Sequence, residues 1–234
     1  MRFGLPIIVA TGSLGMAAAS LYYATYCVRS QWLGRTYWRG RPDTNAVALT
    51  FDDGPSPDTE GILDVLAEHH LSATFFMVGR EVESFPGIAQ RVFAEGHEVG
   101  NHSYSHPLYL FQRGAETRDQ VKRTQDVIAK TIGVRPMFAR PPCGVRSPAY
   151  FGATHSLNLL TVQWDVAGFD WKRNSPNQIA RNVLRKVRAG SIILLHDGDS
   201  SGKQGRRNTV RALPLIIEGL KHRALEIVPL SQLF

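Results

Sequence analysis

Cysteine is scarce in this sequence. Only Cys27 and Cys143 occur among its 234 residues, one at the edge of an apolar terminus and one in a proline-rich segment. A small secreted protein that is stabilised by a disulfide framework needs several paired cysteines, so this class of protein is excluded. Internal repeats and low-complexity tracts are also missing. The length then indicates one globular domain of moderate size with an appendage.

Acidic residues are too few to balance the basic ones. The 20 aspartates and glutamates accompany 27 lysines and arginines, which gives a net charge of +7, and hydrophobic residues make up 43% of the chain. This composition excludes a disordered chain. No nucleic-acid motif of fixed spacing accompanies the positive charge, so we expect no nucleic-acid partner. We assign the basic residues to a face beside a membrane or an anionic envelope polymer.

Charge is absent between Phe3 and Val28. This apolar stretch is longer than the ~20 residues that span a bilayer as a helix, so we interpret residues 1–28 as an uncleaved transmembrane anchor. The alternative is a cleaved signal segment, with Arg2 as its basic end and Ala17–Ala19 as its cleavage site. Apolar character continues as far as Tyr23, which favours the anchor.

Residues 29–45 form a basic and aromatic linker whose composition suits the membrane interface. Four arginines follow the apolar stretch in this linker, whereas only Arg2 precedes it. The positive-inside rule would therefore leave the rest of the chain on the cytoplasmic side. The rule is a bias, and the orientation stays open.

Strand-like and helix-like segments alternate from Ala46 to the C-terminus. The pattern predicts strands at 46–51, 73–78, 97–101, 137–140, 159–164, 191–196 and 225–228, and helices at 57–69, 86–95, 116–132, 176–187 and 208–221. This alternation implies a parallel sheet. We expect an α/β fold over residues 46–234, a distorted (β/α) barrel with about seven parallel strands, preceded by the N-terminal hydrophobic helix.

Two adjacent carboxylates, Asp52 and Asp53, close the first predicted strand. Neighbouring side chains of a strand point in different directions, so one carboxylate can bind a metal while the other handles protons. A simple Asp-Gly turn that caps a strand would give the same local pattern. His102 and His106 are spaced so that a helical turn would place both imidazoles on one side. Two histidines and a carboxylate suit a catalytic zinc ion.

Five motifs follow one another from residue 50 onward: Thr50-Phe-Asp-Asp-Gly-Pro55, His102-Ser-Tyr-Ser-His106, Arg140-Pro-Pro-Cys-Gly144, Phe169-Asp-Trp171 and Ile193-Leu-Leu-His196. In this order and approximate spacing they resemble the polysaccharide deacetylase, or NodB-homology, family, which is carbohydrate esterase family 4. The resemblance covers essentially residue 46 to the C-terminus. It implies a distorted (β/α) barrel and metal-dependent removal of acetyl groups from sugars.

The resemblance also implies a role for each polar residue of these motifs. Asp53, His102 and His106 would bind a divalent metal ion, Zn²⁺ or alternatively Co²⁺ or another divalent ion. Asp52 would act as the general base and His196 as the general acid. The supporting residues would be Asp170, which orients His196; Arg140, which holds Asp52; Cys143, whose backbone N–H stabilises an oxyanion; and Trp171 and Leu194, which line the acetyl pocket.

Two positions depart from the family pattern. Cys143 stands where the family usually has tyrosine, which keeps the backbone donor and removes an aromatic wall. Ala167 stands where the fourth motif normally begins with aspartate, so Arg140 loses a partner that Asp165 would have to replace. All three metal-ligand positions are intact.

The sequence thus predicts a membrane-anchored, metal-dependent hydrolase. It would remove N-acetyl or O-acetyl groups from amino-sugar units of an envelope polysaccharide or a chitin-like oligomer. We expect the catalytic domain in the cell envelope, outside the cytoplasm. Two alternatives stay open: deacylation of a lipid-linked amino sugar at the membrane surface, which fits the arginine-rich linker, and an inactive relative that binds glycan without cleaving it.

Overall fold

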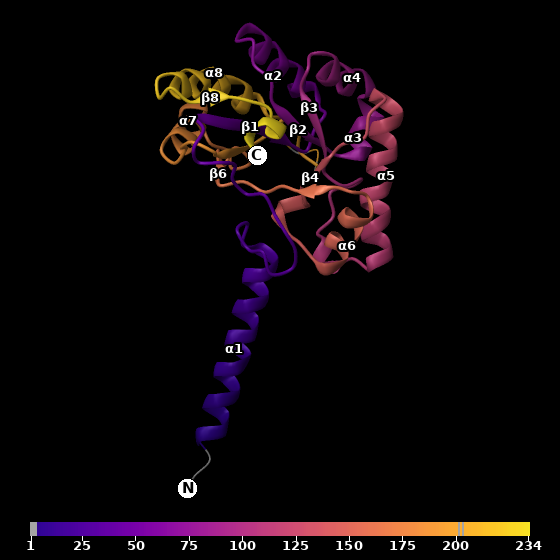
Figure 1. Ribbon diagram of the computed structural model, residues 1–234, viewed down its shortest axis with the longest axis vertical. Coiled ribbons are helices and arrows are strands. Elements are labelled where there is room, and N and C mark those ends of the chain that lie inside the picture. The colour runs from indigo at the N-terminus through magenta and orange to yellow at the C-terminus, as the bar shows by residue number, and fades with distance from the viewer. Residues whose placement is uncertain (1–3, 201, 203) are drawn as a thin grey trace.

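A curled parallel sheet forms the centre of the molecule (Figure 1). The structure, a computed structural model, describes residues 4–200, 202 and 204–234, with side chains from residue 15 onward. Seven strands follow the order β5-β4-β3-β2-β1-β7-β6, β8 pairs with β1 off this path, and the pairings are parallel. The strands are β1 (Ala46–Asp52), β2 (Thr74–Met77), β3 (Glu98–Asn101), β4 (Phe138–Ala139), β5 (Leu160–Thr161), β6 (Val166–Ala167), β7 (Ile192–His196) and β8 (Glu226–Ile227). This half-barrel confirms the predicted α/β fold of about seven parallel strands.

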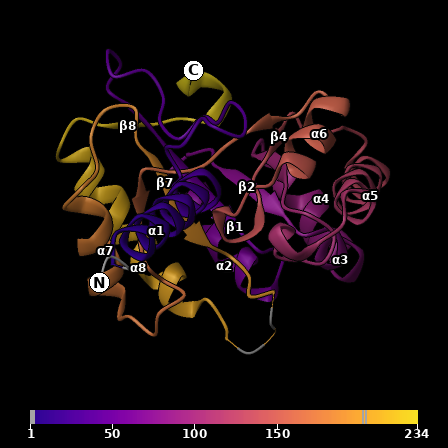
Figure 2. The ribbon, with the colours of Figure 1, turned by 90° about the horizontal axis from the view of Figure 1, so that it is seen from below.

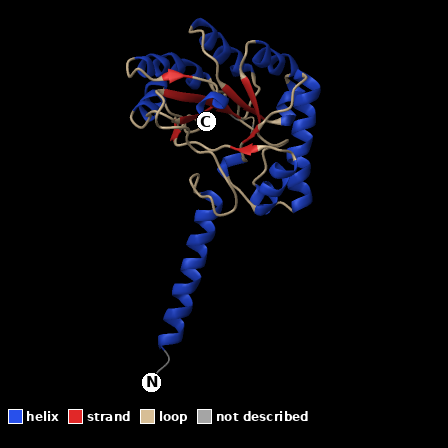
Figure 3. Cartoon of the chain, viewed as in Figure 1, coloured by secondary structure: helices blue, strands red, loops and turns tan. Residues whose placement is uncertain are grey.

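Helices cover the outside of the sheet (Figure 3). Seen from below, α7 and α8 lie on one side of the strands and α3 and α5 on the other (Figure 2). The helices are α1 (Gly4–Tyr26), α2 (Pro57–Glu68), α3 (Gly79–Ser84), α4 (Pro86–Ala94), α5 (Gly114–Ile132), α6 (Pro148–Ser156), α7 (Pro176–Leu184) and α8 (Arg207–Lys221), with short 3-10 helices η1 (Tyr109–Phe111), η2 (Pro142–Gly144) and η3 (Leu230–Leu233).

Strand β1 is buried along its whole length. Its large side chains Val47, Leu49 and Phe51 belong to the main hydrophobic core, in which Phe51 stacks on Phe75 with ring centroids 5.0 Å apart. Because side chains alternate along a strand, Thr50 and Asp52 point to the opposite, inner face. The inner face therefore turns polar at the C-terminal end of β1, where the candidate site lies.

The chain before β1 packs against the domain. Tyr37 bridges to Val162 and Arg39 to Ser191, and the Tyr37 ring lies 4.8 Å from the Phe234 ring. The segment predicted as a linker therefore adds backbone pairing at the sheet.

Helix α1 lies in the segment predicted as a transmembrane anchor, and Figure 1 shows it projecting away from the domain. Over the described residues, no helix combines the length and the apolar character that crossing a membrane requires. The predicted membrane span is therefore not supported.

Candidate active site

Asp52 is the last residue of β1 and Asp53 is the first residue after it. Asp52 continues the extended strand, whereas Asp53 has a φ of 77°, in the left-handed region that aspartate tolerates better than most residues. The following turn is fastened by Asp197, whose Oδ1 accepts the Gly54 N–H at 3.0 Å. The two carboxylates take different partners, as expected, but a left-handed residue after the strand separates them rather than the alternation of an extended chain.

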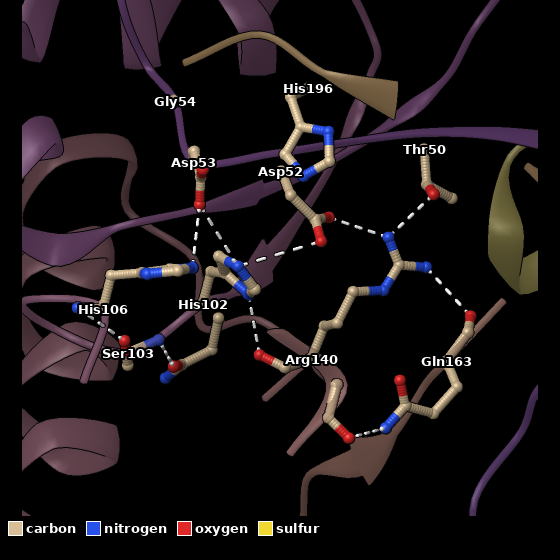
Figure 4. A network of polar contacts seen from close by, with 12 residues as sticks. Thr50, Asp52, Asp53, Gly54, His102, Ser103, His106, Arg140, Gln163 and His196 are labelled. Atoms are coloured by element: carbon tan, nitrogen blue, oxygen red, sulfur yellow. Dashed lines mark hydrogen bonds and ion pairs between the residues drawn. The ribbon is translucent and has the colours of Figure 1, made fainter. Parts of the chain in front are cut away.

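Asp53 meets His102 and His106 (Figure 4). Its Oδ1 lies 3.1 Å from Nε2 of His106 and 3.4 Å from Nε2 of His102, and the three ligand atoms lie within 4.8 Å of one another. The two histidines converge from a loop with positive φ at Ser103 and His106. The helical turn predicted for this motif is therefore wrong, because the loop itself aims the rings.

The tautomer of His102 follows from its partners. Its Nδ1 lies 2.8 Å from the carbonyl oxygen of Arg140, which can only accept, so Nδ1 carries the proton. In the neutral imidazole, Nε2 then presents a lone pair toward the Asp53 carboxylate. Two electron-pair donors at this distance attract only through a cation or proton between them. The residues present therefore fit a divalent ion such as Zn²⁺, held by two imidazoles and one carboxylate.

Electrostatics keep Asp53 ionised. Burial by itself raises the pKa of the Asp53 carboxyl, but the adjacent His102 and His106 outweigh it and hold that pKa well below its usual range. Burial lowers the pKa of His102, and the charges of Asp52 and Asp53 raise it more. The Asp53 carboxylate therefore carries a negative charge beside the position that a cation would occupy.

Asp52 forms a buried ion pair with Arg140. Nη1 of Arg140 donates to Oδ1 of Asp52 at 2.7 Å and to Thr50 Oγ1 at 2.8 Å, while Nη2 donates to the backbone carbonyl of Gln163 at 3.0 Å. Burial lowers the pKa of Arg140, and Asp52 raises it. Five donors in a rigid plane let one arginine hold Asp52 and Thr50 of β1 together with the backbone at Gln163.

Asp165 does not replace the aspartate that Ala167 lacks. Its carboxylate accepts from Ser191 Oγ at 3.1 Å and from the Ile192 N–H at 2.9 Å, and Arg39 lies 3.9 Å away. The idea that Asp165 would pair with Arg140 is therefore wrong. Its offset of two residues along the chain places it against β7 instead.

His196 lines the cavity and pairs with Asp170, which lies behind it. Nδ1 of His196 lies 2.9 Å from Asp170 Oδ1, and Asp170 Oδ2 accepts from the His196 N–H at 2.7 Å and from Thr209 Oγ1 at 2.9 Å. Burial lowers the pKa of His196, but the Asp170 charge raises it more, to about 9. The Trp171 ring stands edge-on to His196 at 5.2 Å.

A cavity of about 360 Å³ gathers these groups. The sequence-predicted residues among its lining are Asp52, Asp53, His102, His106, Cys143, Trp171, Leu194 and His196. Arg140 and Asp170 lie behind it as the partners of Asp52 and His196. Trp164 and Arg206 also line the cavity. Neither residue belongs to the five motifs identified in the sequence. Trp164 ends the strand predicted at 159–164, and this position at a strand end could have marked it as a candidate site residue.

Comparison with known sequences decides the family. A family model described as Polysaccharide deacetylase matches residues 39–162. The chain belongs to the polysaccharide deacetylase family. A peptidoglycan-N-acetylglucosamine deacetylase from Bacillus cereus is 40% identical over 80% of this chain and 68% of its own length. A chitooligosaccharide deacetylase from Bradyrhizobium sp. is 39% identical over 81% of this chain and 91% of its own length. Membership at this identity places the chain among the deacetylase hydrolases.

Solved structures of polysaccharide deacetylases share the fold. The Bc1960 peptidoglycan N-acetylglucosamine deacetylase, in complex with a benzamide, superposes with a TM-score of 0.80 and 38% identity over 85% of this chain and 92% of its own. A pseudoenzyme of family CE4 from Bacillus anthracis superposes with a TM-score of 0.78 and 30% identity over 85% of this chain and 68% of its own. Because a pseudoenzyme shares this fold, fold likeness alone does not establish turnover.

Proposed function

We propose that this protein is a metal-dependent deacetylase that removes N-acetyl groups from amino-sugar units of peptidoglycan or of a chitin-like oligomer. One observation carries the proposal: the triad of Asp53, His102 and His106 shares one cavity with Asp52 and His196. Such a cavity would place a base, an acid and a cation site around a single acetyl group of the substrate. Relatives that act on peptidoglycan N-acetylglucosamine and on chitooligosaccharides support the substrate class.

Asp53, His102 and His106 would hold the divalent ion, which when bound supplies positive charge that acidifies water and polarises a carbonyl. Asp52, oriented by Arg140, takes a proton from the attacking water. As the water oxygen bonds to the acetyl carbon, the carbonyl oxygen becomes negative. Cys143 lines the cavity, and its backbone N–H would donate to that oxygen. His196 then gives a proton to the sugar nitrogen as the C–N bond breaks, which yields acetate and a free amine.

A general acid that is protonated at neutral pH favours an amide over an ester as the substrate. An amine leaves only when it is protonated, whereas an alkoxide needs less help. Asp170 keeps His196 charged at neutral pH, which provides that proton. N-acetyl groups are therefore the proposed target, and O-acetyl groups would be poorer ones.

We further propose that the domain works in the cell envelope, where peptidoglycan lies. The arginines of residues 29–41 are the observation that favours a second candidate, a lipid-linked amino sugar at a membrane surface. An inactive glycan-binding protein is the third candidate, and Cys143 and Ala167 are the departures from the family pattern that favour it.

Acetate release tests the proposal directly. The full chain loaded with Zn²⁺ is incubated with N-acetylglucosamine oligomers and with peptidoglycan, and an Asp52→Asn variant serves as the control. We expect release by the wild-type chain, and a fall of kcat by at least about a hundredfold in the variant, because general-base catalysis contributes ~10²–10⁴-fold. The variant should still bind Zn²⁺, because Asp53 and both histidines remain. Absence of release despite bound Zn²⁺ would refute the proposed substrates. Absence of both acetate release and Zn²⁺ binding would favour the inactive glycan-binding protein.

A further inference from the structure

A buried arginine ties the turn that carries Cys143 to the end of helix α1. The Arg146 side chain is fully buried. Its Nη2 lies 2.6 Å from the carbonyl oxygen of Cys27 and 3.3 Å from that of Thr25, and its backbone N–H donates to Thr25 at 3.1 Å. The carbonyls of Ala24 and Val28 complete the set at 3.4 Å. One guanidinium therefore binds carbonyls of the last turn of α1, at Ala24 and Thr25, and of the two residues that follow the helix, Cys27 and Val28.

This contact is also how the charge of Arg146 is compensated. Its side-chain hydrogen-bond partners among the described residues are all backbone carbonyls. The C-terminal end of a helix carries partial negative charge, which favours a cation. Burial lowers the pKa of Arg146, but arginine stays charged in proteins. Arg146 thus depends on the end of α1 for its compensating charge.

The turn between Arg140 and Arg146 needs support. Cys143 has a φ of 54°, in the left-handed region that strains a residue other than glycine. Such a conformation persists only where the surroundings fix it. Gly144 follows with a φ of 69°, and a Cβ there would lie 2.8 Å from the Trp164 ring. The Trp164 ring therefore packs closely against the turn and leaves no space for a side chain at Gly144.

Three anchors hold this turn. Arg140 fastens its beginning to β1 through Asp52. Gln163 donates from Nε2 to the Gly144 carbonyl at 3.0 Å. Arg146 fastens its end to Thr25 of α1 and to Cys27, just after the helix. The first two anchors come from the sheet, and the third comes from the chain before the domain.

We infer that Arg146 is a positioning residue for the deacetylation proposed above: by binding the carbonyls at the end of α1, it fixes the backbone at Cys143, where the oxyanion forms. This inference rests on the proposed function. An oxyanion donor acts only when it is already in place, and a displacement of about 1 Å costs ~10²-fold in rate. The end of α1 therefore belongs to the catalytic unit, although none of the α1 side chains that the structure describes, from residue 15 onward, is part of the cavity lining.

Variants of the full-length chain test this inference. Arg146→Gln removes the charge, Arg146→Lys keeps it with fewer donors, and Arg135→Gln is the matched control, since Arg135 is an exposed arginine that pairs with Asp126 at the surface. Three quantities are measured: amide hydrogen exchange of residues 141–147 without metal, Zn²⁺ affinity, and the kcat and KM of acetate release.

We expect faster exchange over 141–147 in Arg146→Gln. We also expect kcat to fall about ten- to a hundredfold, with KM and Zn²⁺ affinity within about twofold of wild type, because the base, the acid and the ligands stay in place. Arg146→Lys should fall between wild type and the glutamine variant, because an ammonium group also binds a helix C-terminus. Arg135→Gln should match wild type.

Two results would overturn the inference. One is unchanged exchange and unchanged kcat in Arg146→Gln. The other is a joint loss of kcat, KM and Zn²⁺ affinity, which would show a general loss of fold. Should Arg146→Gln not fold, Arg146→Lys carries the same test. If the wild-type chain releases no acetate, the proposed function fails, and the exchange of 141–147 alone decides whether Arg146 holds the turn.

Discussion

At the residue scale, His196 and Asp170 form a pair that is charged at neutral pH. Burial raises the pKa of Asp170, and His196 lowers it more. The pKa of His196 is raised to about 9, above the ~6.5 of an unfolded chain. The stability that the raised pKa of His196 contributes is therefore fully present below pH ~6.5 and is lost as pH rises through about 9, whereas the contribution of Asp170 is lost as pH falls through its lowered pKa. The same range sets where His196 can act as an acid.

Replacing Asp170 should move the pH dependence of the reaction. In Asp170→Asn the main charge that raises the pKa of His196 is gone, so the basic limb of the kcat profile should shift from about pH 9 toward lower pH. Acetate release is measured between about pH 6 and pH 10, a range that brackets the ordinary histidine pKa of ~6.5 and the raised pKa of about 9. The pH at which kcat falls on the basic side gives the apparent pKa of the acid. Asp126→Asn, at an exposed surface pair, is the control. A basic limb that stays in place in Asp170→Asn would show that another group donates the proton.

The residues of the motifs could be predicted from the sequence, whereas the residues outside the motifs that support them could not. Asp53, His102 and His106 carry a recognisable spacing, and the structure brings them together. Gln163 and Thr209 hold Gly144 and Asp170 from distant parts of the chain. No local spacing marks such residues, because their role depends on tertiary packing alone.

At the element scale, long periodic segments were predictable and short ones were not. Helices α5 and α8 have clear apolar stripes and were expected within a few residues. Helix α3 has six residues and β6 has two, too few for a period to show. Helix α6 was missed although Ser147 caps it and Pro148 opens it, because its apolar residues form no stripe.

The start of α7 offers a test of an element's own stability. The Ser175 side chain caps this helix by accepting the N–H of Gln178. Ser175→Ala should lower the free energy of unfolding by about 1 kcal/mol, the usual loss for an N-cap. Urea unfolding measures it, with Ser231→Ala, at an exposed position, as the control. An unfolding free energy equal to that of the control would mean that packing on α8, and not the cap, holds α7.

At the scale of the whole molecule, the sheet brings together groups that are far apart in the sequence. Asp52 of β1 pairs in register with His196 of β7, and Met77 of β2 pairs with Asn101 of β3, next to His102. The expectation that strand ends meet on one face follows from parallel pairing and could be made from the sequence. The docking of Tyr37 on Val162 could not, because an isolated bridge has no sequence pattern. The chain before β1 therefore contributes more to the domain than its composition suggests.

Metal binding should stabilise the whole fold. A ligand that binds only the folded state adds about 2.7 kcal/mol at a hundredfold excess over its Kd. For a chain of this size each kcal/mol raises Tm by ~2–4 °C, so Zn²⁺ at that excess should raise Tm by about 5–10 °C. Thermal unfolding with Zn²⁺ and with a chelator measures the shift. Asp53→Asn removes the only carboxylate of the triad and should abolish most of it, whereas His155→Ala, on the exposed side of α6, should leave it intact. A full shift in Asp53→Asn would place the ion at another site and would remove the basis for assigning Asp52 as the base beside it.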